Sequence, residues 1–273
     1  MPHTCAVPLR WADMDLLGHV NNVTYLDYLA QARTAFLADL RAGDGRVTGH
    51  RIDFVAPLVF GRRPALVDTS VSDVDGAVLT LTHVVRDDAP SGSVTHLRAE
   101  STLELHSAPD HDLRARLEDL RDEPLAWREV RGERRPGRHR LALPVRGSDV
   151  GADGLVRDDA VVELFQESRI LYFMDLHERG QDWGRVVVAR TDVGLLAPVR
   201  PRAAAYDVHA WVAHVGEKSF TVRSELRDPL VADGAAGAVL ATALVVLVGF
   251  DLDTQRPVAL TAQQRERLEA ELA

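Results

Sequence analysis

The sequence predicts an α+β protein built from two repeats, each with a long buried helix wrapped by a curved antiparallel sheet. The first observation is a duplication, since residues 10–40 align without a gap with residues 146–176, at an offset of about half of the 273-residue chain. The second is a helix in each repeat that is apolar over most of its circumference, as expected of a buried helix. The third is a series of runs after each helix in which apolar and polar residues alternate, as in antiparallel strands with one wet face.

The duplication is supported by identical residues and by a later match in the same order. "FVAPL" (54–58) of the first repeat recurs as "LLAPV" (195–199) in the second. Self-similarity of this kind marks a repeated folding unit. We therefore expect a first domain over 1–122, a linker over 123–140 and a second domain over 141–273. The identical pairs include Asp13/Asp149, Gly18/Gly154, Arg33/Arg169 and Leu40/Leu176.

In the first repeat, a short strand over 6–12 leads into a polar loop that contains glycine. A helix is expected from about Asn22 to Leu40, because apolar residues recur there at helical spacing. A hairpin turn is expected at "DVDGA" (73–77), between two runs of strand character. The four strands expected after the helix cover 51–59, 65–74, 77–87 and 93–106.

The second repeat follows the same order. A strand over 140–147 precedes a loop and a helix from about Asp158 to Leu176, and further strands follow. The apolar stretch at 235–250 is short for a membrane span and rich in β-branched residues, so a buried strand is expected there.

Two more helices are expected at the surface of the protein. Residues 111–123 and 261–273 are the two segments, and they occupy equivalent places after the two sets of strands. Thr261 is the expected N-cap of the second, because a hydroxyl side chain can accept a hydrogen bond from the first helical turn.

Composition narrows the classes of function. The formal net charge is -9 at pH 7, which argues against a nucleic-acid partner, since such proteins need a basic surface. Cys5 is the single cysteine, so the chain has no intrachain disulfide. The N-terminal residues do not have the pattern of a secretory signal. The expected location is therefore the cytoplasm, with no membrane partner.

One stretch resembles the signature of a known family. "RWADMDLLGHVNNVTYLDYLAQAR" (10–33) is similar to that of hotdog-fold thioesterases of the 4-hydroxybenzoyl-CoA thioesterase type, with D-x-D-x-x-G-H-V-N-N followed by a Tyr-rich helix that ends in Ala-Arg. The "D-F-x-x-P" start of the next strand also matches. The resemblance is strong over 8–60 and weaker across 141–273. It implies a tandem repeat, a double hotdog, in which the sheets of two units join into one pseudo-dimer with active sites at their interface.

Thioester hydrolysis needs chemical groups that the polar loop and the helix after it can supply. The reaction needs a carboxylate, which attacks the carbonyl carbon or deprotonates a water, and donors for the oxyanion that forms. The N-terminus of a buried helix supplies unpaired N–H groups and a partial positive charge. The resemblance implies Asp15 as the catalytic carboxylate and the backbone N–H of Asn22 as the oxyanion donor. Without the resemblance, Asp15 would be interpreted as a helix cap or as an arginine partner. The layout calls for no metal and no cofactor.

The resemblance implies roles for further residues. His19 orients the acyl group or positions a water, and Gly18 lets the thioester approach the backbone closely. Asn21 either binds the substrate or caps the helix. Arg62 and Arg63, in "FGRRP", are candidates for the phosphates of a coenzyme A (CoA) thioester.

The second copy of the loop lacks the proposed chemistry. Gly151 takes the place of the carboxylate and Leu155 that of the imidazole, and Asp153 is two residues out of register. We therefore expect one working site in the chain. Asp13 is kept in both copies as Asp13 and Asp149, which favours a structural role for it.

The expected function is an acyl-CoA thioesterase, a hydrolase of acyl thioesters. An acyl carrier protein thioester stays open as an alternative substrate, because a basic patch in this loop region or in the linker suits either carrier. One alternative is a protein that binds an acyl thioester without hydrolysing it. A second is a hotdog dehydratase, which ranks low because Asp15 and His19 are four residues apart and the asparagines follow the histidine. The resemblance is also consistent with a homodimer.

Overall fold

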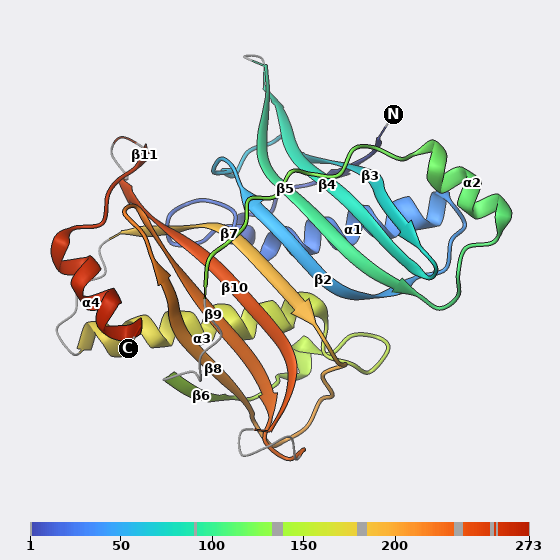
Figure 1. Cartoon of the computed structure of the whole chain (residues 1–273). Coiled ribbons are helices and arrows are strands. Elements are labelled where there is room, and N and C mark those ends of the chain that lie inside the picture. The colour runs from blue at the N-terminus through green and yellow to red at the C-terminus, as the bar shows by residue number, and fades with distance from the viewer. Residues whose placement is uncertain are drawn as a thin grey trace. The chain divides into compact units, whose positions relative to one another are not determined.

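The computed structural model describes residues 2–89, 92–132, 139–178, 185–231, 237–251, 254 and 256–272. The chain divides into two compact units, Met1–Arg128 (unit 1) and Glu129–Ala273 (unit 2). Each unit has its own set of antiparallel strands and its own long helix (Figure 1).

Unit 1 begins with a strand and a short 3₁₀ helix, then a long helix and four long strands. Its elements are β1 (His3–Val7), η1 (Trp11–Asp13), α1 (Thr24–Asp39), β2 (Gly45–Phe54), β3 (Ala65–Asp75), β4 (Val78–Ala89), β5 (Gly92–Leu105) and α2 (His111–Asp119).

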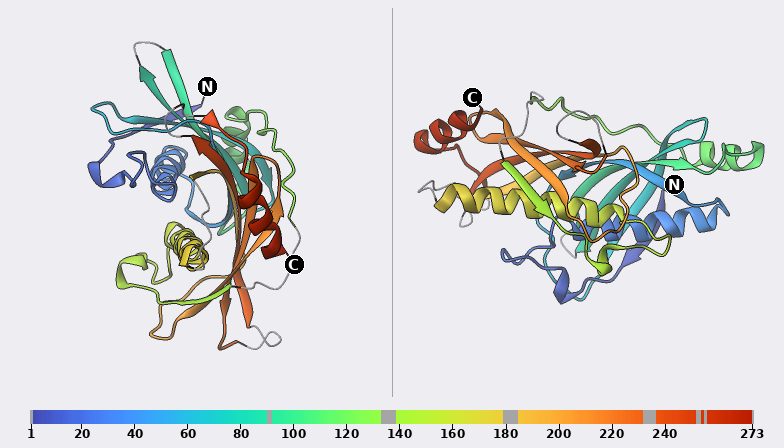
Figure 2. Two further views of the ribbon diagram at one scale, coloured as in Figure 1. Left: turned by 90° about the vertical axis from the view of Figure 1, so that its left-hand side faces the viewer. Right: turned by 90° about the horizontal axis from the view of Figure 1, so that it is seen from below.

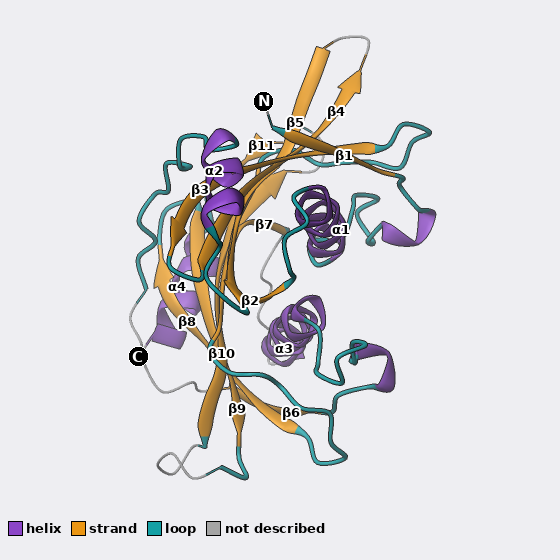
Figure 3. Ribbon diagram, turned by 90° about the vertical axis from the view of Figure 1, so that its right-hand side faces the viewer, coloured by secondary structure: helices purple, strands orange, loops and turns teal. Residues whose placement is uncertain are grey.

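The sheet of unit 1 is antiparallel throughout and curves around α1 (Figure 3). Its strand order is β1-β3-β4-β5-β2. Alternate residues of β4 are completely buried, which is the period of a strand with one face on a core. α1 fills the concave side with Phe36, which is 1% exposed, and with its other buried side chains. The helix is therefore the core of the unit. The buried residues of β4 are Leu79, Leu81, His83 and Val85.

Polar side chains interrupt this core. His83 is fully buried, and its Nδ1 lies 3.0 Å from the hydroxyl of Thr69 on the neighbouring strand. Its Nε2 has no hydrogen-bond partner within the described residues. His50 and Ser101 form a second buried pair, 3.0 Å apart. Burial, with smaller contributions from the nearby charges of Arg33 and His50, lowers the pKa of His83 to about 3, so the ring is neutral in the folded protein.

Unit 2 repeats the plan of unit 1. The order of its sheet is β7-β10-β9-β8-β6, again antiparallel, and β11 pairs with β10. Its elements are β6 (His139–Leu143), η2 (Gly147–Asp149), α3 (Asp158–Glu178), β7 (Val186–Leu195), β8 (Tyr206–Val215), β9 (Ser219–Asp228), β10 (Ala238–Asp251), β11 (Arg256–Pro257) and α4 (Ala262–Leu272).

The structure confirms the α+β class and the plan of one core helix with four following strands in each half. The strand expected over 6–12 is wrong. β1 ends at Val7, before a proline that has no N–H to donate, and residues 11–13 form η1 instead. The turn of η1 closes because the Asp13 N–H donates to the Arg10 carbonyl (3.1 Å) and the Asp13 carboxylate accepts from the Arg10 N–H (2.7 Å). Sequence periodicity does not reveal such a local hydrogen-bond pair.

The remaining helices lie close to their expected positions. α2 ends at Asp119, four residues before the expected end. The N-cap at Thr261 is confirmed, since its hydroxyl accepts from the Gln264 N–H (3.2 Å) while the Gln264 side chain accepts from the Thr261 N–H (2.8 Å). Among the helices of the described residues, none is both long enough and apolar enough to cross a membrane.

Candidate active site

The loop between η1 and α1 is a narrow hairpin, and Asp15 lies directly before its turn. Met14 and Val20 form an isolated antiparallel bridge at its base. Inside the hairpin, the Asp15 N–H donates to the His19 carbonyl at 2.8 Å. The hairpin is fastened to the segment after β2, because the Val20 N–H donates to the Leu58 carbonyl at 2.8 Å. The position of Asp15 is thus set by backbone hydrogen bonds on both sides.

The carboxylate of Asp15 is held at one oxygen only. Oδ1 accepts from the backbone N–H of Leu17 (2.8 Å) and of His19 (3.3 Å). Within the described residues, Oδ2 forms no hydrogen bond and the carboxylate forms no ion pair with an arginine. The half-buried side chain is therefore fixed in orientation while one oxygen stays available to a ligand.

Helix α1 begins at Thr24, two residues later than the expected Asn22. The reason is a turn ahead of it, in which the Asn21 side chain accepts from the Val23 N–H (2.9 Å) and the Asn21 carbonyl accepts from the Thr24 N–H (3.0 Å). Asn21 therefore forms the turn that leads into α1, whose N-cap position is Val23. The backbone N–H of Asn22, which is half-buried, makes no hydrogen bond within the described residues.

Two tyrosines of α1 belong to this region and were not expected from the sequence. The hydroxyl of Tyr28 donates to the carboxylate of Asp13 at 2.6 Å. The buried ring of Tyr25 packs edge-on against Tyr28 and against Phe54 of β2, with 5.8 Å between centroids in each case. Burial raises the pKa of Tyr25, and the negative charge of Asp15 raises it further. The Tyr25 hydroxyl is therefore neutral.

A sequence signal for these tyrosines exists in the duplication. At the offset of the repeat, Tyr25 corresponds to Val161 and Tyr28 to Leu164. Both tyrosines thus occur only in the copy that carries Asp15, although the partner of Tyr28, Asp13, has a counterpart in each copy.

His19 and Gly18 complete the hairpin. The backbone of His19 bridges to Val59, and its half-buried ring forms no hydrogen bond within the described residues. Gly18 has φ +76°, a left-handed conformation that L-residues rarely adopt, and a Cβ there would meet nothing within 4 Å. The turn alone accounts for this glycine, and the open space beside it is what a close approach by a ligand needs.

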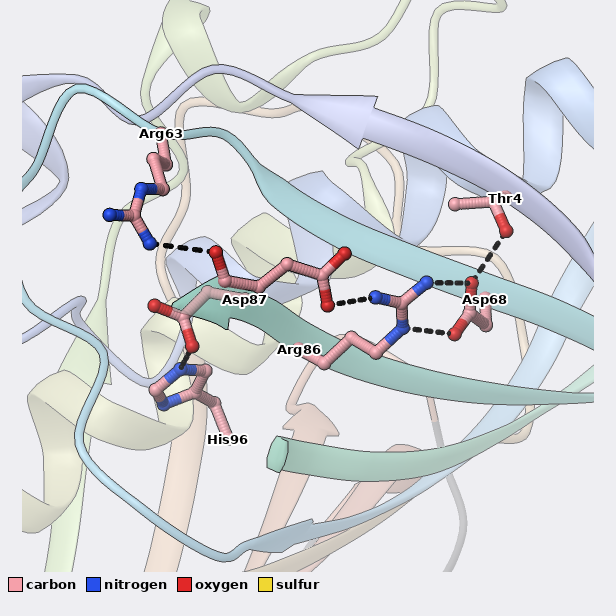
Figure 4. Close-up of polar contacts among 7 residues, drawn as sticks. Thr4, Arg63, Asp68, Arg86, Asp87 and His96 are labelled. Atoms are coloured by element: carbon pink, nitrogen blue, oxygen red, sulfur yellow. Dashed lines mark hydrogen bonds and ion pairs between the residues drawn. The ribbon is translucent and has the colours of Figure 1, made fainter. Parts of the chain in front are cut away.

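Polar contacts at the ends of β4 and β5 support the segment after β2 (Figure 4). The His96 ring places Nε2 3.1 Å from the carboxylate of Asp87, and the His96 carbonyl accepts from the N–H of Val55 at 2.8 Å. Arg63 donates from Nη1 to the carbonyl of Asp88 at 2.7 Å. The segment that holds the Asp15 hairpin is itself anchored to the sheet.

The two candidate arginines differ in their surroundings. Arg63 is tied to Asp88, whose carboxylate pairs with Arg86, which in turn pairs with Asp68 at 2.6 Å (Figure 4). Arg62 is exposed. Both lie on the loop that follows the segment to which the Asp15 hairpin is hydrogen-bonded, in a place that an anionic group can reach.

The expected linker contains an arginine-rich stretch that lies partly outside the described residues. Arg134, Arg135 and Arg138 are in the part that is not described. Arg140 is in β6 and pairs with Asp207 at 2.7 Å. Ahead of the run, Trp127 donates from its indole to Glu100 of β5 at 2.6 Å, so this part of the chain runs along the sheet of unit 1.

The second copy of the hairpin keeps its backbone hydrogen bonds without the candidate side chains. The Gly151 N–H donates to the Leu155 carbonyl at 2.8 Å, as in the first copy, and Gly154 has φ +77°. The Asp153 carboxylate accepts from the Leu155 N–H at 3.0 Å and lies 2.9 Å from the place of a Cβ on Gly151. Asp158, the counterpart of Asn22, is the first residue of α3, and its carboxylate accepts from the N–H of the next residue at 3.0 Å.

The curved antiparallel sheet around one long helix in each unit defines a tandem hotdog protein. A family model of the thioesterase-like superfamily matches residues 9–105 and 145–268. The chain therefore belongs to this superfamily, with both repeats matched. No curated protein matches the chain.

Solved structures of thioesterases share the fold over nearly the whole chain. An acyl-ACP thioesterase from Bacteroides thetaiotaomicron is 14% identical, with a TM-score of 0.63 and coverage of 90% of this chain and 97% of that one. A 12:0-ACP thioesterase from Umbellularia californica is 11% identical, with a TM-score of 0.68 and coverage of 94% of both chains. A provisionally assigned oleoyl thioesterase from Lactobacillus plantarum is 12% identical, with a TM-score of 0.69 and coverage of 91% and 96%. At these identities the similarity is one of fold.

Proposed function

We propose that this protein hydrolyses acyl thioesters, with Asp15 as nucleophile or general base and the start of α1 as the oxyanion hole. Membership of the thioesterase-like superfamily supports the reaction class. The resemblance of residues 8–60 to the 4-hydroxybenzoyl-CoA thioesterase type supports CoA as the carrier of the acyl group.

The observation that carries the proposal is the contrast between the two hairpins. The same backbone hydrogen bonds form in both, so neither the carboxylate nor the imidazole is needed for folding of the loop. Only the first hairpin holds a carboxylate at the position of Asp15. Ahead of its helix, the backbone N–H of Asn22 is unpaired within the described residues. In the second, Asp158 puts a carboxylate at the helix start, where it would repel an oxyanion.

The reaction follows by one of two routes. In the first, the free oxygen of Asp15 attacks the thioester carbonyl, the C–S bond breaks, the thiolate leaves and water hydrolyses the resulting anhydride. In the second, Asp15 removes a proton from a water that attacks the carbonyl. In both, negative charge develops on the carbonyl oxygen, and a donor such as the Asn22 N–H stabilises it.

The test is turnover of a panel of acyl-CoA thioesters, followed with a thiol-reactive dye. We expect Asp15→Asn to lower kcat/KM by a factor of about 100 or more, the usual range for loss of a catalytic base. Asp153→Asn is the matched control, because Asp153 accepts from the backbone of the equivalent turn. The proposal is wrong if Asp15→Asn, folded as the parent by circular dichroism, retains full turnover.

A further inference from the structure

A β-bulge in β5 anchors the chain that follows β2. The pairing of β4 with β5 shifts between Val85 and Arg86, which leaves His96 as the extra residue of β5. The His96 carbonyl accepts from the N–H groups of Val55 (2.8 Å) and Ala56 (3.2 Å). Beyond the bulge, β4 and β5 continue as a two-stranded ribbon, which projects from the rest of unit 1 in the left view of Figure 2. The anchor therefore lies where this ribbon begins.

The anchored chain in turn holds the candidate site. We call residues 55–59 the support segment. Its Leu58 carbonyl accepts from the Val20 N–H at 2.8 Å, and Val59 bridges to the backbone of His19. A shift of the support segment is therefore passed on to the hairpin that carries the candidate carboxylate.

The side chain of His96 adds a second connection at the bulge. Its ring is 7% exposed and places Nε2 3.1 Å from the carboxylate of Asp87 on β4 (Figure 4). The other ring nitrogen, Nδ1, faces the carbonyl of Ala56 in the support segment at 3.4 Å. The imidazole thus lies between an acceptor on the sheet and an acceptor on the support segment. Because the ring is buried, water does not replace these contacts when the ring is removed.

The second copy forms the same bulge without a histidine. Leu240 is the extra residue of β10, and its carbonyl accepts from the N–H groups of Leu196 (2.9 Å) and Ala197 (3.0 Å). The hairpin of this copy is also held at the equivalent carbonyl, that of Val199 (2.9 Å). The backbone connections therefore do not require an imidazole, which occurs at the bulge only in the copy that carries Asp15.

The carboxylate of the pair is kept in both copies, but its partner is not. Asp87 corresponds to Asp228, because each is the second strand residue after the shift in pairing. Asp228 pairs with Arg202, in the loop after β7, at 2.6 Å. The carboxylate is thus part of the framework common to both units. What the first copy adds is a connection from this carboxylate to the bulge through His96.

We propose that His96 is a positioning residue for the thioesterase reaction. Its ring fixes the support segment against Asp87, and the support segment sets where the Asp15 hairpin stands relative to the start of α1. This inference rests on the proposed function and adds to it a residue outside the loop. Misplacement of a catalytic group by about 1 Å can lower the rate about 100-fold, so a residue that never touches the substrate can govern turnover.

The first test is the turnover of octanoyl-CoA. His96→Leu places the residue of the second copy in the bulge, and Asp87→Asn removes the charge that faces the ring. We expect each to lower kcat by about tenfold or more and to leave KM near the parent value, because only the alignment of the reacting groups is disturbed. His96→Gln regains most of the rate, since its amide nitrogen can donate to Asp87 from near the place of Nε2. Leu240→His is the matched control and leaves both constants as in the parent.

The second test needs no turnover. Hydrogen exchange of the Val20 amide, followed by nuclear magnetic resonance, reports on its bond to Leu58. We expect exchange about tenfold faster in His96→Leu, the change in a local opening equilibrium that loss of one hydrogen bond produces. The Val156 amide, which donates to Val199 in the second copy, keeps its rate. Asp87→Asn, which retains the imidazole, is measured in the same way.

The two tests separate this inference from the proposed function. Faster exchange at Val20 alone supports the coupling of His96 to the hairpin even if the parent hydrolyses no CoA thioester, a result that overturns the proposed function by itself. Parent-like exchange at Val20 in His96→Leu, or a parent-like kcat in that variant, overturns the inference. Equal acceleration at Val20 and Val156 also overturns it, since that result marks a general loss of stability.

Discussion

The buried imidazole of His83 makes the stability of unit 1 dependent on pH. Its ring is fully buried beside Thr69, and burial lowers its pKa to about 3. In the unfolded chain a histidine titrates near about 6.5. Between these two values the unfolded chain binds one proton more than the folded protein. The free energy of unfolding therefore falls as the pH falls through this window.

The size of the effect follows from linkage. One proton of difference changes the free energy of unfolding by about 1.4 kcal/mol per pH unit. Between pH 7 and pH 5, the loss assigned to His83 is about 2 kcal/mol, because most of the titration of the unfolded histidine lies between pH 6.5 and pH 5. The contribution of His83 to the free energy of unfolding is fully present above the pKa of the histidine in the unfolded chain.

The substitution His83→Asn removes the titration and keeps a polar partner for Thr69. We expect the free energy of unfolding, measured by urea titration, to fall between pH 7 and pH 5 by about 2 kcal/mol more in the parent than in the variant. The absolute stability of the variant does not enter, since only the difference between the two pH values is compared. Parallel pH profiles would refute the reasoning. So would a nuclear magnetic resonance titration in which the His83 ring gains its proton above pH 5.

Two further predictions concern the hairpin. Gly18→Ala and Gly154→Ala each place a Cβ on a residue whose φ is near +76°, so both are expected to lower the free energy of unfolding by about 1–2 kcal/mol, measured by urea titration. Only Gly18→Ala should also lower kcat/KM, because it shifts Asp15. An equal effect of both on turnover would contradict the assignment of the site to the first copy. Tyr28→Phe removes the 2.6 Å hydrogen bond to the Asp13 carboxylate and is expected to cost about 1.5–3 kcal/mol in the same titration. A change below 0.5 kcal/mol, on the order of experimental error, would show that water replaces the hydroxyl.

Much of the fold is predictable from the sequence because the duplication lets each element be identified twice, once in each repeat. The hairpin turn at Gly76 and the cap at Thr261 follow from local chemistry that the sequence displays directly. The start of α1 does not, because either Asn21 or Asn22 has the right side chain for a cap. Only the geometry shows that the Asn21 oxygen receives the Val23 N–H.

The candidate site is less predictable than the fold. A motif places Asp15 beside the helix, but the sequence does not say that its second oxygen forms no hydrogen bond to any part of the chain that the structure describes. Trp11 and Leu16 illustrate a second limit. Apolar residues in a short segment suggest a strand or a core position, and their exposure follows only from the way η1 carries the segment outward.

The close approach of Asp153 to Gly151 has an evolutionary consequence. A Cβ at position 151 would lie 2.9 Å from the Asp153 oxygen that now accepts from the Leu155 N–H. Reversion of this glycine to aspartate would set two carboxylates in competition for one backbone donor. An aspartate at position 151 would therefore require the Asp153 side chain to shift, and it would still leave Leu155 in the place of His19.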